Sequence, residues 1–99
     1  MSEIRIDYSN ARQQARKLQE AAAQCEDAIR ELRRAESEIP SCWTGEAATA
    51  YLQGLEKRIE EISRIRRQAD DLADMIRTTA ARFEEAERRT KEAIAAAFE

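Results

Sequence analysis

The sequence predicts an all-α protein: an antiparallel two-helix hairpin with a short turn, which dimerises into a four-helix bundle. Three observations lead to this prediction. The composition is helical, because alanine is abundant and the 99 residues include only two glycines and one proline. Apolar residues recur at steps of three and four along two long stretches. One short break separates the stretches. The length allows a single helical-hairpin domain over residues 1–99.

The first helix is expected at about residues 8–39. Asp7 or Ser9 can cap its start. Pro40 ends it, because the residue before a proline is disfavoured in the α conformation. One face carries a stripe of small and apolar residues: Tyr8, Ala11, Ala15, Leu18, Ala22, Cys25, Ile29 and Leu32.

The turn is expected at residues 40–44. So short a connection makes the two helices antiparallel neighbours. Thr44 is the expected N-cap of the second helix, with Glu46 favourably placed in its first turn. Gly45 gives the backbone room at the bend. Folding about residue 42 would place residue 32 opposite residue 52 and residue 15 opposite residue 69.

The second helix is expected at about residues 45–91, followed by a fraying tail at 92–99. Three ion pairs of i,i+4 spacing support its end: Glu84–Arg88, Glu85–Arg89 and Glu87–Lys91. Its stripe is Ala48, Leu52, Leu55, Ile59, Ile62, Ile65, Ala69, Leu72, Ile76, Ala80 and Phe83. The residues predicted to pack the hairpin or the dimer are Leu18, Cys25, Ile29, Leu32, Leu52, Leu55, Ile59, Ile62, Ile65, Leu72 and Ile76.

A single hairpin cannot cover all the apolar surface of the second helix. Its apolar band, which includes Met75, is wider than one facing helix can bury, and domains of this size usually need oligomerisation. We therefore expect a dimer with a four-helix core. Gly54 costs about 1 kcal/mol relative to alanine inside a helix, which indicates close approach by a neighbouring helix. Tyr51 is either a recognition residue or, as we favour, a core residue at the closed end.

The composition argues against catalysis and several kinds of binding. Without histidine the chain has no ordinary general base near neutral pH and no imidazole ligand, and it contains no nucleophile motif or phosphate-binding glycine loop. We therefore expect no catalytic residues, no cofactor and no metal site. Cys25 and Cys42 are too far apart along a hairpin to form a disulfide; Cys25 is expected in the packing stripe and Cys42 at the surface.

Charge and hydropathy narrow the partners further. The net charge of -3 argues against a nucleic-acid partner. No apolar run approaches the roughly 20 residues of a membrane-spanning helix, so stable membrane insertion is not expected. The stretch MSEIRIDYSN lacks the basic segment and apolar core of a signal peptide.

The tripeptide Trp43-Thr44-Gly45 stands between the two long helices of a chain of about one hundred residues. In this setting the whole chain resembles the Trp-X-Gly (WXG) family, the small Esx-type substrates of type VII secretion systems. The resemblance implies synthesis in the cytoplasm and export to the outside as a folded helical dimer, without a cleavable signal peptide. It also implies that the protein is not an enzyme. The implied partners are a second copy or a sister WXG protein, and the membrane ATPase of the secretion machine.

The family also carries a C-terminal export motif, in which an acid follows an aromatic residue by four positions. In a longer form, hydrophobic residues follow the acid by three and seven positions. The matching residues are Phe83, Glu87, Thr90 and Ile94, with Phe83 in place of the commoner tyrosine and Thr90 only half apolar. These four positions share one helix face, as helix-in-groove recognition requires.

Other interpretations of the same residues remain open. The protein could be a helical chaperone or targeting partner for a larger secreted toxin, or a cytosolic coiled-coil adaptor. Trp43 could have a packing role only, as an apolar side chain that covers the end of the helix pair. Glu87 could serve only as the ion-pair partner of Lys91. In an antiparallel dimer, Trp43 of one chain would lie near the Phe83 end of the other, and the resemblance implies a composite export signal of this kind.

Overall fold

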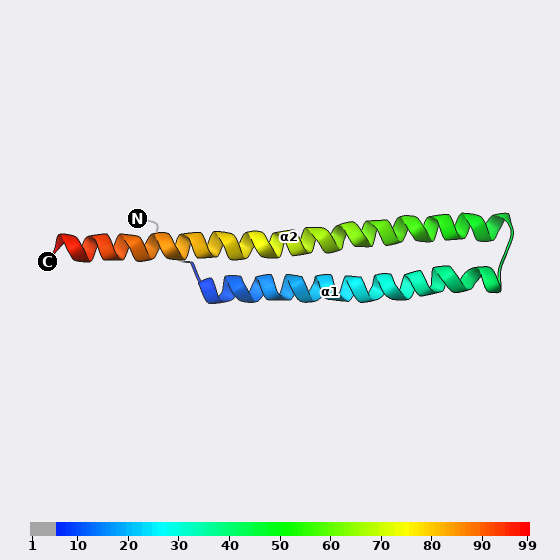
Figure 1. Cartoon of the computed structure of the whole chain (residues 1–99), viewed down its shortest axis with the longest axis horizontal. Coiled ribbons are helices and arrows are strands. Elements are labelled where there is room, and N and C mark those ends of the chain that lie inside the picture. The colour runs from blue at the N-terminus through cyan, green and yellow to red at the C-terminus, as the bar shows by residue number, and fades with distance from the viewer. Residues whose placement is uncertain (1–5) are drawn as a thin grey trace.

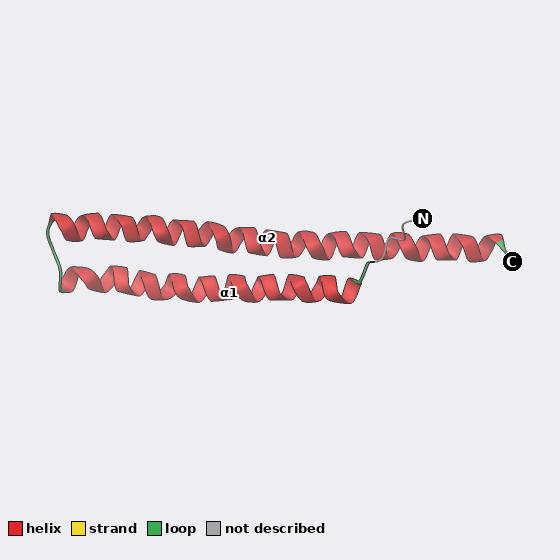
Figure 2. Ribbon diagram, turned by 180° about the vertical axis from the view of Figure 1, so that it is seen from behind, coloured by secondary structure: helices red, strands yellow, loops and turns green. Residues whose placement is uncertain are grey.

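A computed structural model, which describes residues 6–99, confirms the all-α hairpin. Helix α1 (Tyr8–Glu38) leads through a short 3-10 helix, η1 (Ile39–Ser41), into helix α2 (Glu46–Ala97). The two long helices run antiparallel and side by side (Figure 1 and Figure 2). The molecule measures 81 × 22 × 16 Å, and its radius of gyration is 23.0 Å. A compact domain of this length would have about 13 Å, so the hairpin is a thin rod. The first five residues of the stretch MSEIRIDYSN lie outside the described residues.

The break between the helices follows from local chemistry. Asp7 is the N-cap of α1, and its carboxylate accepts a hydrogen bond from the Asn10 N–H at 2.9 Å. At the other end, Pro40 stops the helix and the chain tightens into η1. The prediction that Thr44 caps α2 is wrong. Gly45 occupies the N-cap position instead. The backbone there has a φ of 111°, a conformation that glycine adopts readily and that strains other residues.

Helix α2 continues six residues beyond the predicted end at residue 91, so the prediction of a fraying tail is wrong. The tail contains four alanines, the residue with the highest helix propensity, and an ion pair between Arg88 and Glu92 spans the last turns. The expected Glu84–Arg88 and Glu87–Lys91 pairs are absent among residues 6–99, since Glu84 pairs across the hairpin with Arg12. Glu85–Arg89 forms, at 3.2 Å.

The core between the helices is narrow and consists mostly of alanine. Ile59 is its only large fully buried side chain within the described chain. Small side chains let the two backbones approach closely but remove little apolar area from water. The buried residues are Ala15, Ala22, Ala48, Ile59, Ala73 and Ala80. The half-buried members of the predicted packing set are Leu18, Cys25, Ile29, Leu32, Leu52, Leu55, Ile62 and Ile76.

Two members of the predicted packing set face outward instead. Ile65 is 55% exposed and Leu72 is 45% exposed. The α2 residues that face α1 repeat every seven positions, which brings Arg66 and Ala73 toward α1. Ile65 and Leu72 each precede one of these residues and therefore lie about 100° around the helix. They form part of a second apolar face of α2.

The register of the hairpin also differs from the prediction. Folding about residue 42 would place Arg12 opposite Leu72, yet Arg12 pairs with Glu84. Arg66 likewise contacts Glu26, at 3.0 Å. Side chains lean toward the N-terminus of their own helix, which is away from the turn in α1 and toward it in α2, so a given α1 side chain meets an α2 residue further from the turn. The long arginine side chains extend the offset.

Candidate docking surfaces at the turn and on the tail

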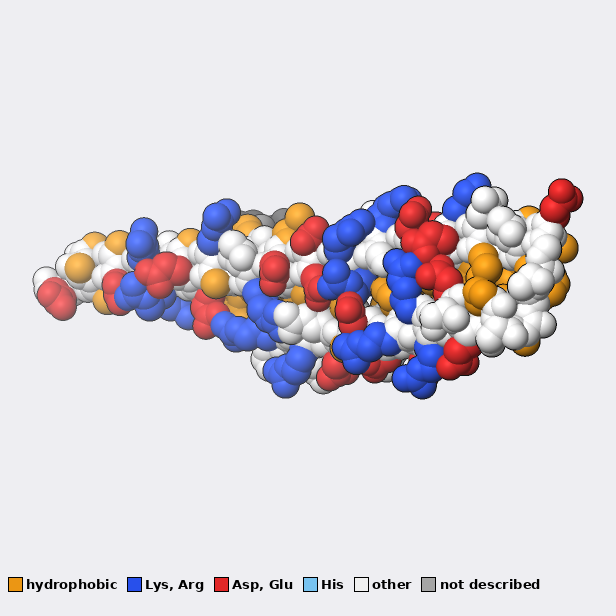
Figure 3. Space-filling model, turned by 45° about the vertical axis from the view of Figure 1, so that its right-hand side comes forward, with side chains coloured by type: hydrophobic (Ala, Val, Ile, Leu, Met, Phe, Trp, Pro, Cys, Tyr) orange, Lys and Arg blue, Asp and Glu red, His pale blue; other side chains and the backbone are white. Residues whose placement is uncertain are grey.

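The turn presents an aromatic pair. The rings of Trp43 and Tyr51 lie 5.5 Å apart between centroids, tilted by 52°, within the range of favourable aromatic contacts. Trp43 remains 42% exposed and Tyr51 55% exposed. The favoured interpretation of Tyr51 as a core residue is therefore wrong. Figure 3 shows hydrophobic side chains gathered at this end, while acidic and basic side chains alternate along the middle of the rod.

Backbone hydrogen bonds hold the turn in one shape. The N–H groups of Cys42 and Trp43 both donate to the Ile39 carbonyl, at 3.0 and 2.9 Å. After the bend, the Gly45 carbonyl accepts from the backbone N–H and the hydroxyl of Thr49, each at 3.0 Å. Gly45 has an extended ψ of -178° together with its positive φ, a combination that essentially only glycine adopts. The tripeptide thus fixes the exit of the chain into α2 and leaves the indole at the surface.

The end of α2 projects beyond the start of α1 (Figure 1). All four residues of the predicted export motif, Phe83, Glu87, Thr90 and Ile94, are exposed along this part of the helix. The Thr90 hydroxyl donates to the Ala86 carbonyl at 2.9 Å, so it is bonded to the helix itself. The stripe therefore starts beside the first turn of α1, where Phe83 and Glu87 share pockets with its residues, and continues along the projecting segment through Thr90 to Ile94.

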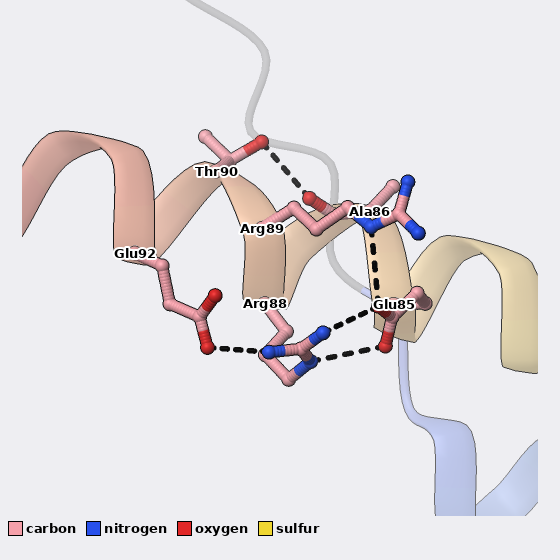
Figure 4. Close-up of polar contacts among 6 residues, drawn as sticks. All are labelled: Glu85, Ala86, Arg88, Arg89, Thr90 and Glu92. Atoms are coloured by element: carbon pink, nitrogen blue, oxygen red, sulfur yellow. Dashed lines mark hydrogen bonds and ion pairs between the residues drawn. The ribbon is translucent and has the colours of Figure 1, made fainter.

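Ion pairs within α2 support the projecting helix (Figure 4). The Glu85 carboxylate accepts from Arg88 at 2.5 and 3.0 Å and from Arg89 at 3.2 Å. These bonds, with that of Arg88 the strongest, lower the pKa of Glu85 to about 2. Arg88 also bonds Glu92. Because these groups are engaged with one another, we assign them to helix support rather than to docking.

The first residue of α1 lies against the base of the tail. Tyr8, Glu84, Glu87 and Lys91 line one open pocket of about 500 Å³. The Tyr8 hydroxyl is buried and has no hydrogen-bond partner within residues 6–99. Burial, followed by the nearby Glu87 carboxylate, raises the pKa of Tyr8 to about 12. Sequence reasoning missed this neighbourhood of Glu87, because it depends on the register of the hairpin.

A second apolar surface runs along α2, which we call the outer face: Tyr51, Gly54, Ile65, Leu72 and Met75. Its large side chains are all exposed, and Met75 is the most exposed of the four, at 62%. Near the tail it borders a groove of about 320 Å³. The groove lies at the open end of the hairpin and is lined almost entirely by apolar atoms from the start of the described chain and from α2: Ile6, Ala11, Met75, Ile76, Thr79, Ala80 and Phe83.

The described residues offer little for chemistry. Within residues 6–99 no three histidine, cysteine or acidic side chains gather as metal ligands would. Cys25 is half-buried and Cys42 exposed, and both are free thiols. Across the same residues, neither helix has a stretch both long and apolar enough to cross a membrane.

Two long antiparallel helices joined by a Trp-Thr-Gly turn define a small helical-hairpin protein with a WXG motif. The family model described as proteins of 100 residues with WXG matches residues 3–88, so the chain belongs to the WXG100 family. This confirms the resemblance seen in the sequence. Searches of curated proteins and of solved structures each return no match.

Membership carries function at the level of the family. WXG100 proteins are non-enzymatic, secreted helical proteins that generally pair with themselves or with partners. Membership of the family therefore supports, at family level, the interpretation of this chain as a small Esx-like substrate of type VII secretion.

Proposed function

We propose that this protein is exported by a type VII secretion system as a folded homodimer of hairpins forming a four-helix bundle. The projecting end of α2 is the export signal, and the membrane ATPase of the secretion machine is its receptor. The observation that carries the proposal is the stripe of Phe83, Glu87, Thr90 and Ile94, whose four side chains stay exposed as α2 passes the start of α1 and projects beyond it. Such a stripe fits an apolar groove that has a basic residue for the acid.

Surface area supports a homodimer. The chain exposes 8045 Å², whereas a compact monomer of 11.3 kDa exposes about 5,700 Å². The excess of roughly 2,300 Å² is comparable to what one subunit buries in an obligate homodimer. A core of five alanines and one isoleucine is thin for a domain that must fold alone. A sister WXG protein could cover the same surface, and the test below distinguishes it from a second copy.

Antiparallel pairing would join the turn to the tail. In one chain Trp43 lies in the turn and Phe83 far along α2, about 60 Å apart along the rod. Two hairpins packed head to tail place the turn of one beside the base of the other's tail. The export signal is then composite, formed by the tail of one chain and the Trp43 turn of the other.

Export of tagged variants tests this proposal. The protein would be expressed in its own host, or in a bacterium with a working type VII system, and cells and medium blotted beside a cytosolic lysis marker. We expect wild type in the medium and both Trp43→Ala and Glu87→Ala retained in cells. Glu92→Ala, which removes a tail carboxylate bonded to Arg88 away from the stripe, is the matched control and should be exported.

Two controls make the outcome decisive. Circular dichroism must show that all variants are helical, and light scattering must give the mass of the purified wild type. Wild type confined to cells, while another substrate is secreted, would refute export and favour an adaptor. A monomer that becomes stable only with a longer co-encoded protein would refute the homodimer and favour a chaperone.

A further inference from the structure

The first turn of α1 lies beside the acid of the export stripe. Arg12 of α1 forms its ion pair with Glu84 of α2, which sets the register at the open end of the hairpin. Tyr8 comes one turn before Arg12 on the same face of α1. Glu87 comes one turn after Glu84 on the same face of α2. Because the helices are antiparallel, both steps lead away from the turn, and the phenol of Tyr8 meets the Glu87 carboxylate in the pocket that both residues line.

This pocket contains a donor and an acceptor that are both unsatisfied within residues 6–99. Of the three acids that line it, Glu84 and Glu85 already form ion pairs with arginines (Figure 4). Glu87 forms none within the same residues. The Tyr8 hydroxyl is buried there without a partner, although a buried hydroxyl is normally hydrogen-bonded. Glu87 is therefore the acceptor available to Tyr8.

Lys91 competes with Tyr8 for the same carboxylate. Glutamate followed by lysine at i,i+4 is a favourable pair on an isolated helix. Lys91 lines the pocket too, yet within residues 6–99 no ion pair joins it to Glu87. Exposed pairs of this kind contribute little, whereas a buried phenol that lacks an acceptor gains a full hydrogen bond from the carboxylate. The choice of partner matters for recognition, because lysine would neutralise the charge of Glu87 and the neutral phenol preserves it.

We propose that Tyr8 is a positioning residue of the export signal: its hydroxyl donates to one oxygen of the Glu87 carboxylate and keeps that side chain away from Lys91. A carboxylate accepts more than one hydrogen bond, so the second oxygen remains available to a basic side chain of the receptor. Fixing the glutamate in advance also reduces the ordering that binding requires. This inference rests on the proposed function and adds the first turn of α1 to its signal.

The contact makes the signal sensitive to folding. Tyr8 and Glu87 belong to different helices, so they meet only when α1 packs along α2. In a chain whose α1 has not docked, the helix that persists around Glu87 would leave this acid to Lys91. A receptor that requires a free and oriented carboxylate therefore favours the folded hairpin over the unfolded chain.

A rescue experiment in the export assay tests the positioning role. Tyr8→Phe removes only the hydroxyl, and we expect the exported fraction to fall by about 3- to 10-fold, the range that one hydrogen bond contributes. Adding Lys91→Gln removes the competing cation, keeps a good helix former, and should restore export to within about 2-fold of wild type. Tyr51→Phe removes the hydroxyl of the other tyrosine in the chain, at the turn end of the rod. It is the matched control and should leave export unchanged.

A spectrophotometric titration checks the contact itself. In a Tyr51→Phe background, the absorbance of the phenolate reports Tyr8 alone. Burial and the Glu87 carboxylate raise the pKa of Tyr8 to about 12. Glu87→Gln removes the second of these causes and should lower that pKa, whereas Glu92→Gln, which removes a carboxylate bonded to Arg88, should leave it unchanged. An unchanged pKa of Tyr8 in Glu87→Gln would overturn the contact.

The outcomes separate this inference from the proposed function. If wild type stays in the cells while another substrate is secreted, the export proposal and the positioning role fall together. If wild type is exported and Tyr8→Phe is exported equally well, the export proposal stands and the positioning role is overturned. Retention of Tyr8→Phe that Lys91→Gln does not relieve, with circular dichroism unchanged, would overturn the competition between Tyr8 and Lys91 for Glu87.

Discussion

Alanine substitutions at Ile59 and Ile65 distinguish the face of α2 that packs against α1 from the outer face of the same helix. Ile59 is fully buried against α1, whereas Ile65 is 55% exposed on the outer face. Ile59→Ala removes three buried carbons, about 2.4 kcal/mol at ~0.8 kcal/mol each. With the cavity left behind, the loss falls within about 2–5 kcal/mol. Ile65→Ala should cost only ~1 kcal/mol in the isolated hairpin, because half of its side chain is already in water.

Urea unfolding followed by circular dichroism at two protein concentrations measures both effects. Ile59→Ala should lower the free energy of unfolding by a similar amount at low and high concentration. Ile65→Ala should cost more at high concentration, where a second copy covers it and dimerisation contributes to stability. The reasoning is refuted if Ile59→Ala costs less than ~1 kcal/mol, or if the cost of Ile65→Ala is the same at both concentrations while wild type changes from monomer to dimer.

Three further predictions concern the turn and the start of α1. Gly45→Ala should lower the free energy of unfolding by about 1–3 kcal/mol in the same urea assay, purely through backbone strain, since the added Cβ meets no atom within 4 Å. The raised pKa of Tyr8 means that the folded state favours the neutral phenol over the phenolate. This preference stabilises the fold fully below pH 10 and is lost as the pH rises toward 12. Tyr8→Phe should remove that alkaline decline in melting curves and should not destabilise the protein at pH 7. Arg12→Ala should cost less than ~1 kcal/mol in thermal melts, because both partners of its ion pair with Glu84 are about half exposed.

The sequence was sufficient for the hairpin because its decisive signals are local. Pro40 must interrupt a helix wherever it stands, and the stripes on either side repeat at helical spacing. The cap and the helix end were less predictable. Whether Thr44 or Gly45 caps α2 depends on the path of the turn, and only the φ of 111° at Gly45 decides it. The alanine-rich end stays helical by propensity, which the expectation of fraying underestimated.

Contacts between distant residues escaped the sequence. A stripe with steps of three and four does not say which of two adjacent rows turns inward, so Ile65 and Leu72 were assigned to the wrong row. The register of the hairpin depends on how side chains lean and on the rise of η1. The approach of Tyr8 to Glu87 depends in turn on that register. The export stripe was easier to find, because its four residues lie on one helix and their spacing alone places them on one face.

The thin core and the proposed composite signal have one physical cause. A hairpin whose centre is mostly alanine leaves large apolar side chains exposed on the second face of α2, and this is the surface that the second copy of the proposed homodimer would cover. In that antiparallel dimer the second copy would also carry its Trp43 turn to the Phe83 end of the first, a contact that no single rod can make across about 60 Å. A receptor that binds turn and tail together would therefore bind the assembled pair and reject the lone chain.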